Sequence, residues 1–169
     1  KFLKKNEITI KDLSFSNMPQ YFGIDRALSC YAAFNMFENK SKQNTLIVDL
    51  GTTISITKIN NKGNLIGGQL LPGFTTQLNS MADNSKNLKV PDVLFIPINN
   101  FQIPTMNAML RGVYNSIIGA IQLAFEPAKD SLILCGGDSN LIGKSLKKEI
   151  PDFIIEPNLV MYGMILLEQ

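Results

Sequence analysis

The 169-residue sequence contains no histidine and only two cysteines, and both shortages narrow the chemistry available to it. Cys30 and Cys135 stand in apolar surroundings without a Cys-x-x-Cys spacing, and there is no imidazole to complete a zinc site. The sequence therefore indicates a protein of a reducing compartment, which we expect to be the cytoplasm, without a structural metal centre.

Charge of one sign is also scarce, since the formal net charge at pH 7 is +2 and the lysines are scattered. The sequence has no basic stripe of the kind that would indicate binding to nucleic acid.

The start of the chain has no apolar run long enough for a signal peptide. The longest apolar stretch, 106–125, is interrupted by polar residues, namely Asn107, Arg111, Asn115 and Gln122. We expect a soluble protein that does not enter a membrane.

What the sequence does contain is enough apolar material for a packed core, at 45% hydrophobic and 18% charged residues. The apolar pattern predicts a three-stranded meander at 45–48, 54–59 and 64–69, with a turn at 60–63. Further strands are predicted at 131–135 and 153–155. Helices are predicted at 26–37, 74–82, 103–125, 140–149 and 159–167.

This order of elements predicts an α/β fold, a ribonuclease-H-like half domain of the kind duplicated in the actin, hexokinase and Hsp70 superfamily. Its sheet is expected to be mixed and five-stranded, with helices on both faces. Residues 1–40 are interpreted as the end of a preceding half domain and residues 41–169 as the C-terminal half domain. Because the chain opens on Lys1 in mid-pattern, we expect a further segment upstream.

The segment Asp49 to Thr53 places a carboxylate, a glycine and two hydroxyls at the end of a buried strand. Asp49 is suited to a metal or alkali ion, while Gly51 and Thr52 are suited to phosphate oxygens. The segment is not a Walker loop, because no Gly-Lys-Ser/Thr follows. The alternative is a plain β-turn whose polar side chains satisfy backbone groups.

Three other motifs have both a functional and a structural interpretation. Gly23-Ile24-Asp25-Arg26 opens a helix, where Asp25 is either a reactive carboxylate or simply a helix cap. The segments Gly67 to Gly73 and Gly136-Gly137 each place bare backbone before a helix, either for an anion or for close packing. Thr105 opens the long helix, where a threonine ordinarily only caps. Gly112 and Gly119 would let another helix approach, within the core or across a subunit interface.

Taken in order, these motifs resemble those of the type III pantothenate kinases. Residues 23–26 are similar to the Gly-x-Asp-Arg of that family, residues 49–55 to its Asp-x-Gly-Thr-Ala-x-Thr, and residues 67–73 to its Gly-Gly-x-x-x-Pro-Gly. Residues 136–137 are similar to part of its Thr-Gly-Gly, and residues 157–163 to its closing Asp-Pro-x-Leu-x-x-x-Gly-Leu. Thr105 precedes Gly112 by the spacing of the family's substrate-binding threonine.

The resemblance implies ATP-dependent phosphorylation of pantothenate to 4′-phosphopantothenate, the first step of coenzyme A biosynthesis, by a homodimer. It implies that Asp25 is the general base and that pantothenate is bound by Gly23, Ile24, Asp25 and Arg26, together with Thr105 of the neighbouring subunit. It further implies that Asp49 binds a monovalent cation, K⁺ or NH₄⁺. ATP, with Mg²⁺, would be held by Gly51, Thr52, Gly136 and Gly137.

The sequence departs from the family pattern at several positions. Thr57 stands where the family has a second aspartate, Thr53 replaces an alanine, and Cys135 replaces a threonine. The family's upstream phosphate motif, Asp-x-Gly-Asn-Thr/Ser-x-x-Lys, is not among these residues, so we expect this chain alone not to be a competent kinase. The departures motivate an alternative, a non-catalytic homologue that regulates or binds a ligand. An acetate-kinase-like or sugar kinase would need other substrate motifs, which the sequence lacks.

Overall fold

The structure is a computed structural model that describes residues 8–13, 17–37 and 43–168. The first seven residues, where no signal peptide is predicted, lie outside the described residues. Parts of the segment 1–40, interpreted from sequence as the end of a preceding half domain, lie outside them as well.

The elements follow the predicted order. A short 3-10 helix, η1, spans Ile10–Asp12 and is followed by α1 (Ile24–Phe37). The meander consists of β1 (Asn44–Leu50), β2 (Thr53–Ile59) and β3 (Leu65–Pro72). The rest of the chain forms α2 (Phe74–Asp83), α3 (Thr105–Ala124), β4 (Asp130–Cys135), α4 (Ser139–Leu146), β5 (Ile154–Ile155) and α5 (Leu159–Leu166).

The strands form one mixed sheet, as the sequence predicted. The five strands lie in the order β3-β2-β1-β4-β5, with antiparallel pairing in the meander and parallel pairing of β1 with β4 and of β4 with β5. Parallel neighbours need a crossover connection, and here α3 and α4 belong to those connections. The carboxyl ends of β1 and β4 therefore meet at one edge of the sheet.

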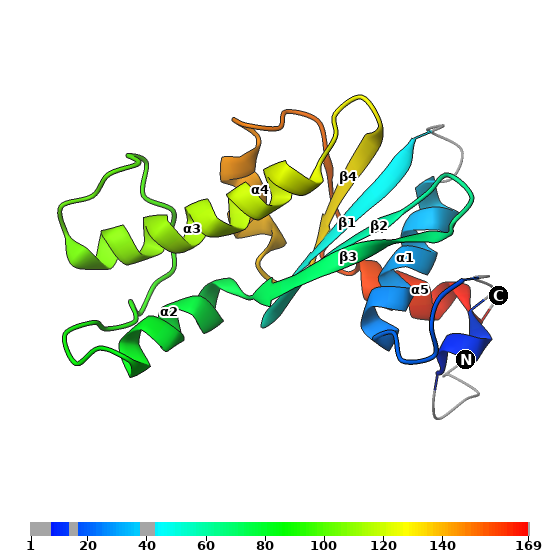
Figure 1. The fold of residues 1–169 in the computed structure, drawn as a ribbon, viewed down its shortest axis with the longest axis horizontal. Coiled ribbons are helices and arrows are strands. Elements are labelled where there is room, and N and C mark those ends of the chain that lie inside the picture. Colours follow the sequence, from blue (N-terminus) through cyan, green and yellow to red (C-terminus); the bar gives the residue numbers. More distant parts are fainter. Residues whose placement is uncertain (1–7, 14–16, 38–42, 169) are drawn as a thin grey trace.

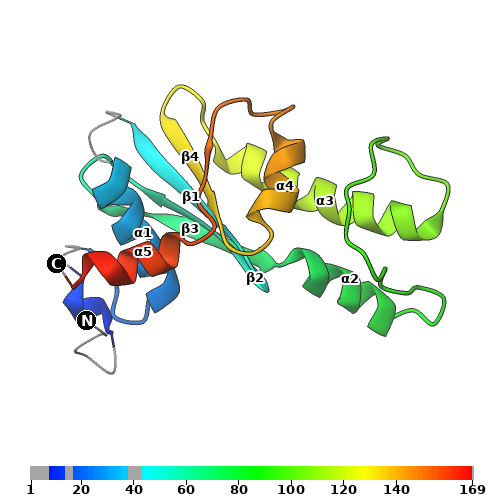
Figure 2. The same ribbon diagram turned by 180° about the vertical axis from the view of Figure 1, so that it is seen from behind.

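Both faces of the sheet are covered, because successive side chains of a strand point to opposite faces. Leu46 and Val48 of β1 belong to a core with α2, α3 and α4, whereas Ile47 belongs to a second core with α1 and α5. Figures 1 and 2 show α1 and α5 together on one side of the sheet and α3 and α4 on the other. The expectation of helices on both faces is confirmed.

The paired helices α2 and α3 extend beyond the sheet. In Figure 1 they project together away from the strands, and α3 begins at the end remote from the sheet. The predicted helix 103–125 is two residues too long at its start, because Pro104 has an extended ψ of 126° and the helix begins at Thr105. Met106 and Leu123, two apolar residues near the two ends of this helix, are 44% and 90% exposed.

The packing of α5 on α1 depends on one glycine. A side chain at Gly163 would overlap the Leu28 carbonyl oxygen, and its Cβ would lie 2.8 Å from the Leu28 carbonyl carbon. Both residues are buried. Glycine is therefore required where α5 crosses α1.

Among the described residues, no helix is long and apolar enough to cross a membrane.

We expect Gly163→Ala to lower the free energy of unfolding by about 1–3 kcal/mol, because an added methyl group must force the two helices apart. Gly112→Ala is the matched control, since a Cβ on this α3 glycine meets nothing within 4 Å. That control should be neutral or stabilising by up to about 1 kcal/mol, the helix-propensity difference. Urea unfolding of both variants measures the difference, and equal stabilities would contradict the packing argument.

Candidate active site

The turn between β1 and β2 is hydrogen-bonded to the start of α2. The Thr52 carbonyl oxygen accepts a hydrogen bond from the Gly73 amide at 2.8 Å and another from the Thr76 hydroxyl at 2.8 Å. Gly51 and Thr52 form the turn, while Asp49 belongs to β1 and not to the turn itself. The backbone at the end of β1 is thus held in place by the Pro72-Gly73 segment, which sequence reasoning had assigned to a separate motif.

Asp49 lies against the first residue after β4. It pairs with Cys135 in the parallel ladder, and Gly136 follows with a φ of +83°, a left-handed conformation that favours glycine. A Cβ on Gly136 would overlap the Asp49 Oδ1 atom and lie 2.8 Å from the Leu50 carbonyl oxygen. Gly136 therefore serves close packing against the carboxylate.

The carboxylates of Asp49 and Asp25 are electrostatic neighbours, although they come from a strand and a helix. Burial raises the pKa of the Asp49 carboxyl above its usual value, and the nearby Asp25 carboxylate raises that pKa further. The half-buried carboxylate of Asp49 and the exposed carboxylate of Asp25 supply oxygen atoms of the kind that hard cations bind. The structure thus brings together two of the predicted site residues.

Asp25 and Arg26 are held at the start of α1. The Asp25 Oδ1 atom accepts a hydrogen bond from the Arg26 amide at 2.8 Å. The Arg26 Nε and Nη2 atoms donate to the Thr57 hydroxyl oxygen at 3.2 and 3.1 Å, and the guanidinium lies 4.2 Å from the centroid of the Phe22 ring. A Cβ on Gly68 would come within 2.5 Å of Arg26 Nη2. Gly68 therefore leaves room for the arginine over the meander.

A cavity of about 380 Å³ lies beside the turn, between the start of α2 and the start of α4. Its walls include residues predicted from sequence, Gly51, Thr52 and Gly137, and residues that were not singled out, Thr75, Thr76, Asn79 and Asp138. Asp138 directly follows the glycine pair, and its amide donates to the Leu50 carbonyl oxygen at 3.0 Å. Burial raises the pKa of its carboxyl. The position of Asp138 directly after Gly137 could have indicated that it lines the site. No comparable signal in the sequence marks the α2 residues of the wall.

Thr105 does not join these residues within one copy of the chain. It opens α3 at the end that projects away from the sheet, whereas Asp25 opens α1, which lies against the sheet (Figures 1 and 2). Gly112 and Gly119 of α3 have open space where a Cβ would be. These two glycines are therefore not needed for packing inside this copy.

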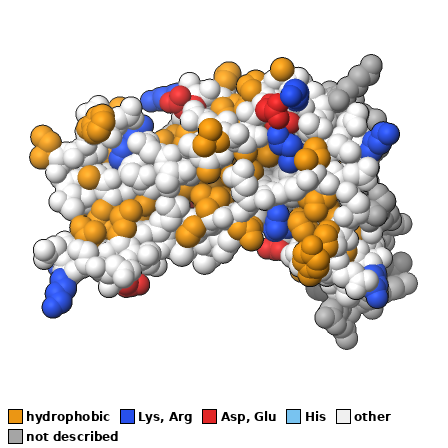
Figure 3. All heavy atoms as spheres, in the orientation of Figure 1, with side chains coloured by type: hydrophobic (Ala, Val, Ile, Leu, Met, Phe, Trp, Pro, Cys, Tyr) orange, Lys and Arg blue, Asp and Glu red, His pale blue; other side chains and the backbone are white. Residues whose placement is uncertain are grey.

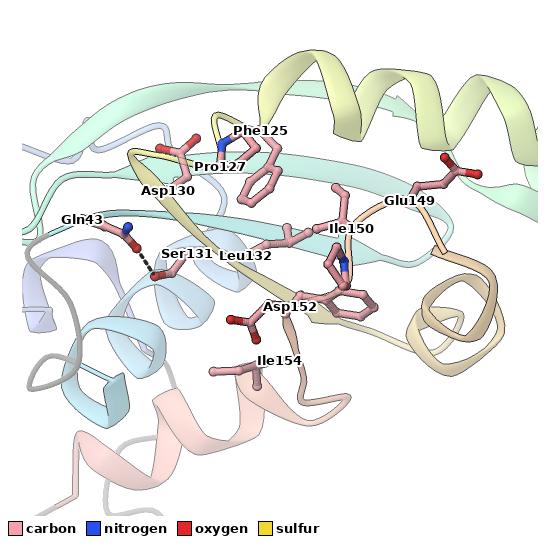
Figure 4. A pocket seen from close by; sticks show the side chains of 12 residues that line it. Gln43, Phe125, Pro127, Asp130, Ser131, Leu132, Glu149, Ile150, Asp152 and Ile154 are labelled. Carbon is pink, nitrogen blue, oxygen red and sulfur yellow. Dashed lines mark hydrogen bonds between the residues drawn. The ribbon is translucent and has the colours of Figure 1, made fainter. Parts of the chain in front are cut away.

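A further cavity lies at the opposite end of β4, where that strand begins (Figure 4). It measures about 400 Å³ and contains apolar side chains such as Leu132 and Ile150, with the carboxylate of Asp152 at its edge. Ser131 donates to the Gln43 side-chain oxygen at 3.2 Å within it. None of the residues predicted for the site lines this cavity.

The sheet order, the two helical layers and the turn at the strand ends define the actin-like ATPase fold. An archaeal actin homolog superposes with a TM-score of 0.55 at 19% identity, over 85% of this chain and 55% of that one. A structure described as a conserved putative Baf family transcriptional activator from Campylobacter jejuni superposes with a TM-score of 0.71 at 25% identity, over 93% of this chain and 68% of that one. The fold class predicted from sequence is confirmed.

The chain belongs to the type III pantothenate kinase family, because the model of that family matches residues 4–126. A type III pantothenate kinase of Acinetobacter baumannii (strain ACICU) is 31% identical over 147 residues, which are 87% of this chain and 57% of that protein. A type III pantothenate kinase of Synechococcus elongatus is 28% identical over 170 residues, or 98% of this chain and 66% of that protein. The chain thus spans about three fifths of the length of these relatives.

We expect Asp49→Asn to stabilise the protein at neutral pH. A folded-state pKa above the unfolded value means that ionised Asp49 opposes folding once the pH exceeds the unfolded pKa of about 3.9. The stability gained by the amide should therefore be present at pH 7 and vanish below about pH 3, where both forms of the protein are neutral at this site.

Urea unfolding at both pH values, without added metal or potassium, measures this difference. Asp152→Asn is the matched control, because Asp152 is exposed at the other end of β4 and should change little. A variant at Asp49 that is less stable than the parent at pH 7 would contradict the argument.

Proposed function

We propose that the chain is the larger, substrate-binding part of an ATP-dependent pantothenate kinase that acts in the cytoplasm. The observation that carries this proposal is the convergence of Asp25 and Asp49 at the strand ends, with a polar cavity beside the Gly51-Thr52 turn. Residues 1–40 would end a preceding half domain, and the remainder would form the C-terminal half domain. Membership of the family supports the proposal.

In this proposal Asp25 is the general base. The 4′-hydroxyl oxygen of pantothenate attacks the γ-phosphorus of ATP, the bond from that phosphorus to the β–γ bridging oxygen breaks, and the hydroxyl proton passes to Asp25. In a loose transition state the base orients the hydroxyl and collects its proton late, so that positioning is its main contribution. Gly23, Ile24 and Arg26 would line the pantothenate pocket.

The residues present fit a cation and the phosphates of a nucleotide. Asp49 would hold the monovalent cation, because its buried and repelled carboxylate gains from a positive neighbour. Gly51, Thr52 and Gly137 would face ATP across the cavity, while Gly136, which does not line it, would contribute by turning the chain at the end of β4. The described residues contain no cluster of three or more His, Cys, Asp or Glu side chains. Mg²⁺ does not require one, because it is ordinarily bound by one or two carboxylates together with substrate phosphates. Its role would be to neutralise phosphate charge.

We expect Asp25→Asn to lower the kcat of pantothenate phosphorylation by a factor of about 10²–10⁴ in the protein that includes the upstream segment. The fold should be intact, because Asn retains an oxygen acceptor for the Arg26 amide. Coupled detection of ADP measures the rate, and Asp152→Asn at the far end of β4 is the control. Near-normal turnover by the Asp25 variant would remove it from the mechanism.

A second candidate function is that of a non-catalytic, ligand-binding homologue. It is favoured by the Arg26 guanidinium, whose partner is the neutral Thr57 hydroxyl where the family pattern has a carboxylate. The description of the Campylobacter jejuni structure as a putative transcriptional activator is compatible with it. Calorimetry with pantothenate and with ATP, on protein that includes the expected upstream segment, separates the candidates, since binding of neither ligand would exclude the kinase.

We further propose that the active protein is a homodimer in which Thr105 of one copy completes the pantothenate site of the other. The segment before α3 exposes an apolar surface, made of Val93, Phe95, Ile98, Phe101, Ile103 and Met106, with exposed fractions from 42% to 100%. Figure 3 shows hydrophobic side chains at this end of the molecule, among several groups spread over the same face. An exposed apolar surface of this kind marks an interaction site, and Thr105 lies inside it.

We expect Ile103→Asp to convert the dimer to a monomer, because it places a charge in the proposed interface. Leu123→Asp is the matched control, since Leu123 is 90% exposed at the far end of α3, the helix that begins just after Ile103. Sedimentation equilibrium of the parent and both variants measures the mass. A dimer that survives Ile103→Asp, or one that is lost equally in the control, would contradict the proposed interface.

A further inference from the structure

A polar cavity with an excess of positive charge lies away from the candidate active site. It measures about 380 Å³ and is enclosed by the segment 96–100, by α3 and by the end of α4. The residues that matter here are Asn99, Asn100, Arg111, Ser145, Lys148 and Glu149. It shares no lining residue with the cavity beside the Gly51-Thr52 turn. The length of α4, about 12 Å, separates the two cavities along that helix.

Arg111 is fixed in this cavity by three contacts. Its Nη1 atom donates to the Pro97 carbonyl oxygen at 3.0 Å, its Nη2 atom donates to the Asn100 side-chain oxygen, and its guanidinium lies 4.9 Å from the centroid of the Tyr114 ring. A guanidinium held in this way has already lost the rotational freedom that anion binding would otherwise remove. The arginine is therefore preorganised.

One donor of this guanidinium is left over. The Nε atom of Arg111 is buried and has no hydrogen-bond partner among the described residues. A buried donor without an acceptor is costly and calls for a water molecule or an ion. An oxyanion in the cavity would reach Nε only after a small shift of the Arg111 side chain, because that atom is buried here. The edge formed by Nε and Nη2 would then match two oxygens of a phosphate or carboxylate group.

The surroundings favour an anion over water. Arg111 and Lys148 outweigh Glu149 by one positive charge, and the side-chain amides of Asn99 and Asn100 add donors. The C-terminus of α4 carries partial negative charge that opposes an anion, and the positive charge of Lys148 beside it offsets this effect. The volume exceeds that of a bare ion and lies in the range of small-molecule sites.

We propose that this cavity is a binding site for a phosphate group, either inorganic phosphate or the phosphate of a small monoester, held by Arg111 and Lys148. The ligand would tie the segment 96–100 to the end of α4. Because this segment leads into Thr105, occupancy would also steady the start of α3. The proposal does not depend on the kinase activity and concerns residues outside the candidate active site.

The chain has only two arginines, so the test uses the Nε–H signals of the ¹⁵N-labelled full chain. Two such signals belong to Arg26 and Arg111, and Arg111→Lys removes one and thereby assigns it. Titration with glycerol 3-phosphate and with inorganic phosphate, against sodium chloride of equal ionic strength, should shift the Arg111 signal along a saturating curve. Tighter binding of the ester would identify a monoester, and equal affinity would identify phosphate itself, both in support of the site.

Lys148→Gln should weaken phosphate binding about tenfold, the loss expected for one charge-assisted hydrogen bond. Lys144→Gln, an exposed lysine of α4 outside the cavity, is the matched control and should leave the affinity unchanged. A shift no larger than in chloride, or saturable binding that Lys148→Gln does not weaken, would overturn the proposal. So would a titration that moves only the amides of Gly51 and Thr52, which would place phosphate at the nucleotide cavity.

Discussion

The close approach of Asp49 to Gly136 is the constraint on which the rest of the site depends. Parallel pairing of β1 with β4 sets Asp49 opposite Cys135, so the next residue must pass the carboxylate without a side chain. The positive φ of Gly136 then turns the chain toward α4, where the Asp138 amide bonds to the Leu50 carbonyl oxygen. One contact between neighbouring strands thus sets the position of a carboxylate, of a helix start and of the cavity between them.

The candidate site has two parts that lie on opposite faces of the sheet and meet at its edge. Asp25 and Arg26 lie with α1 on one face, whereas the cavity beside Gly51 and Thr52 is bounded by α2 and α4 on the other. At the carboxyl end of β1, Asp49 links the two sides: burial and the nearby Asp25 raise its pKa, and the next residue, Leu50, lines the cavity. Ligands of open α/β sheets bind at this kind of edge, where connections leave on opposite faces. A phosphoryl group moving between the two sides would pass this carboxylate.

The sequence allowed the order of elements along the chain, the mixed sheet and the two helical layers to be predicted, because apolar periodicity and glycine turns are local signals. Residues at helix and strand ends could also be predicted, as with Asp25 and Gly137. The wall of the cavity formed by Thr75, Thr76 and Asn79 could not, because it depends on how α2 is fastened to the turn through Gly73. The role of Arg111 was likewise hidden. In the sequence it only interrupts an apolar stretch, and its partners come from a loop of irregular backbone.

Thr57, which stands where the family pattern has an aspartate, changes the net charge beside Arg26. A carboxylate at this position would pair with the guanidinium and neutralise it, whereas a hydroxyl accepts its hydrogen bonds and leaves the positive charge in place. Stacking on Phe22 holds the arginine without neutralising it either. The start of α1 therefore keeps one more unit of positive charge than the family pattern would give. If the site binds pantothenate as proposed, that charge would favour the anionic substrate and would weaken the attraction of a cation to Asp25 and Asp49. The substitution would then shift the balance of the proposed site from cation binding toward binding of the acid substrate.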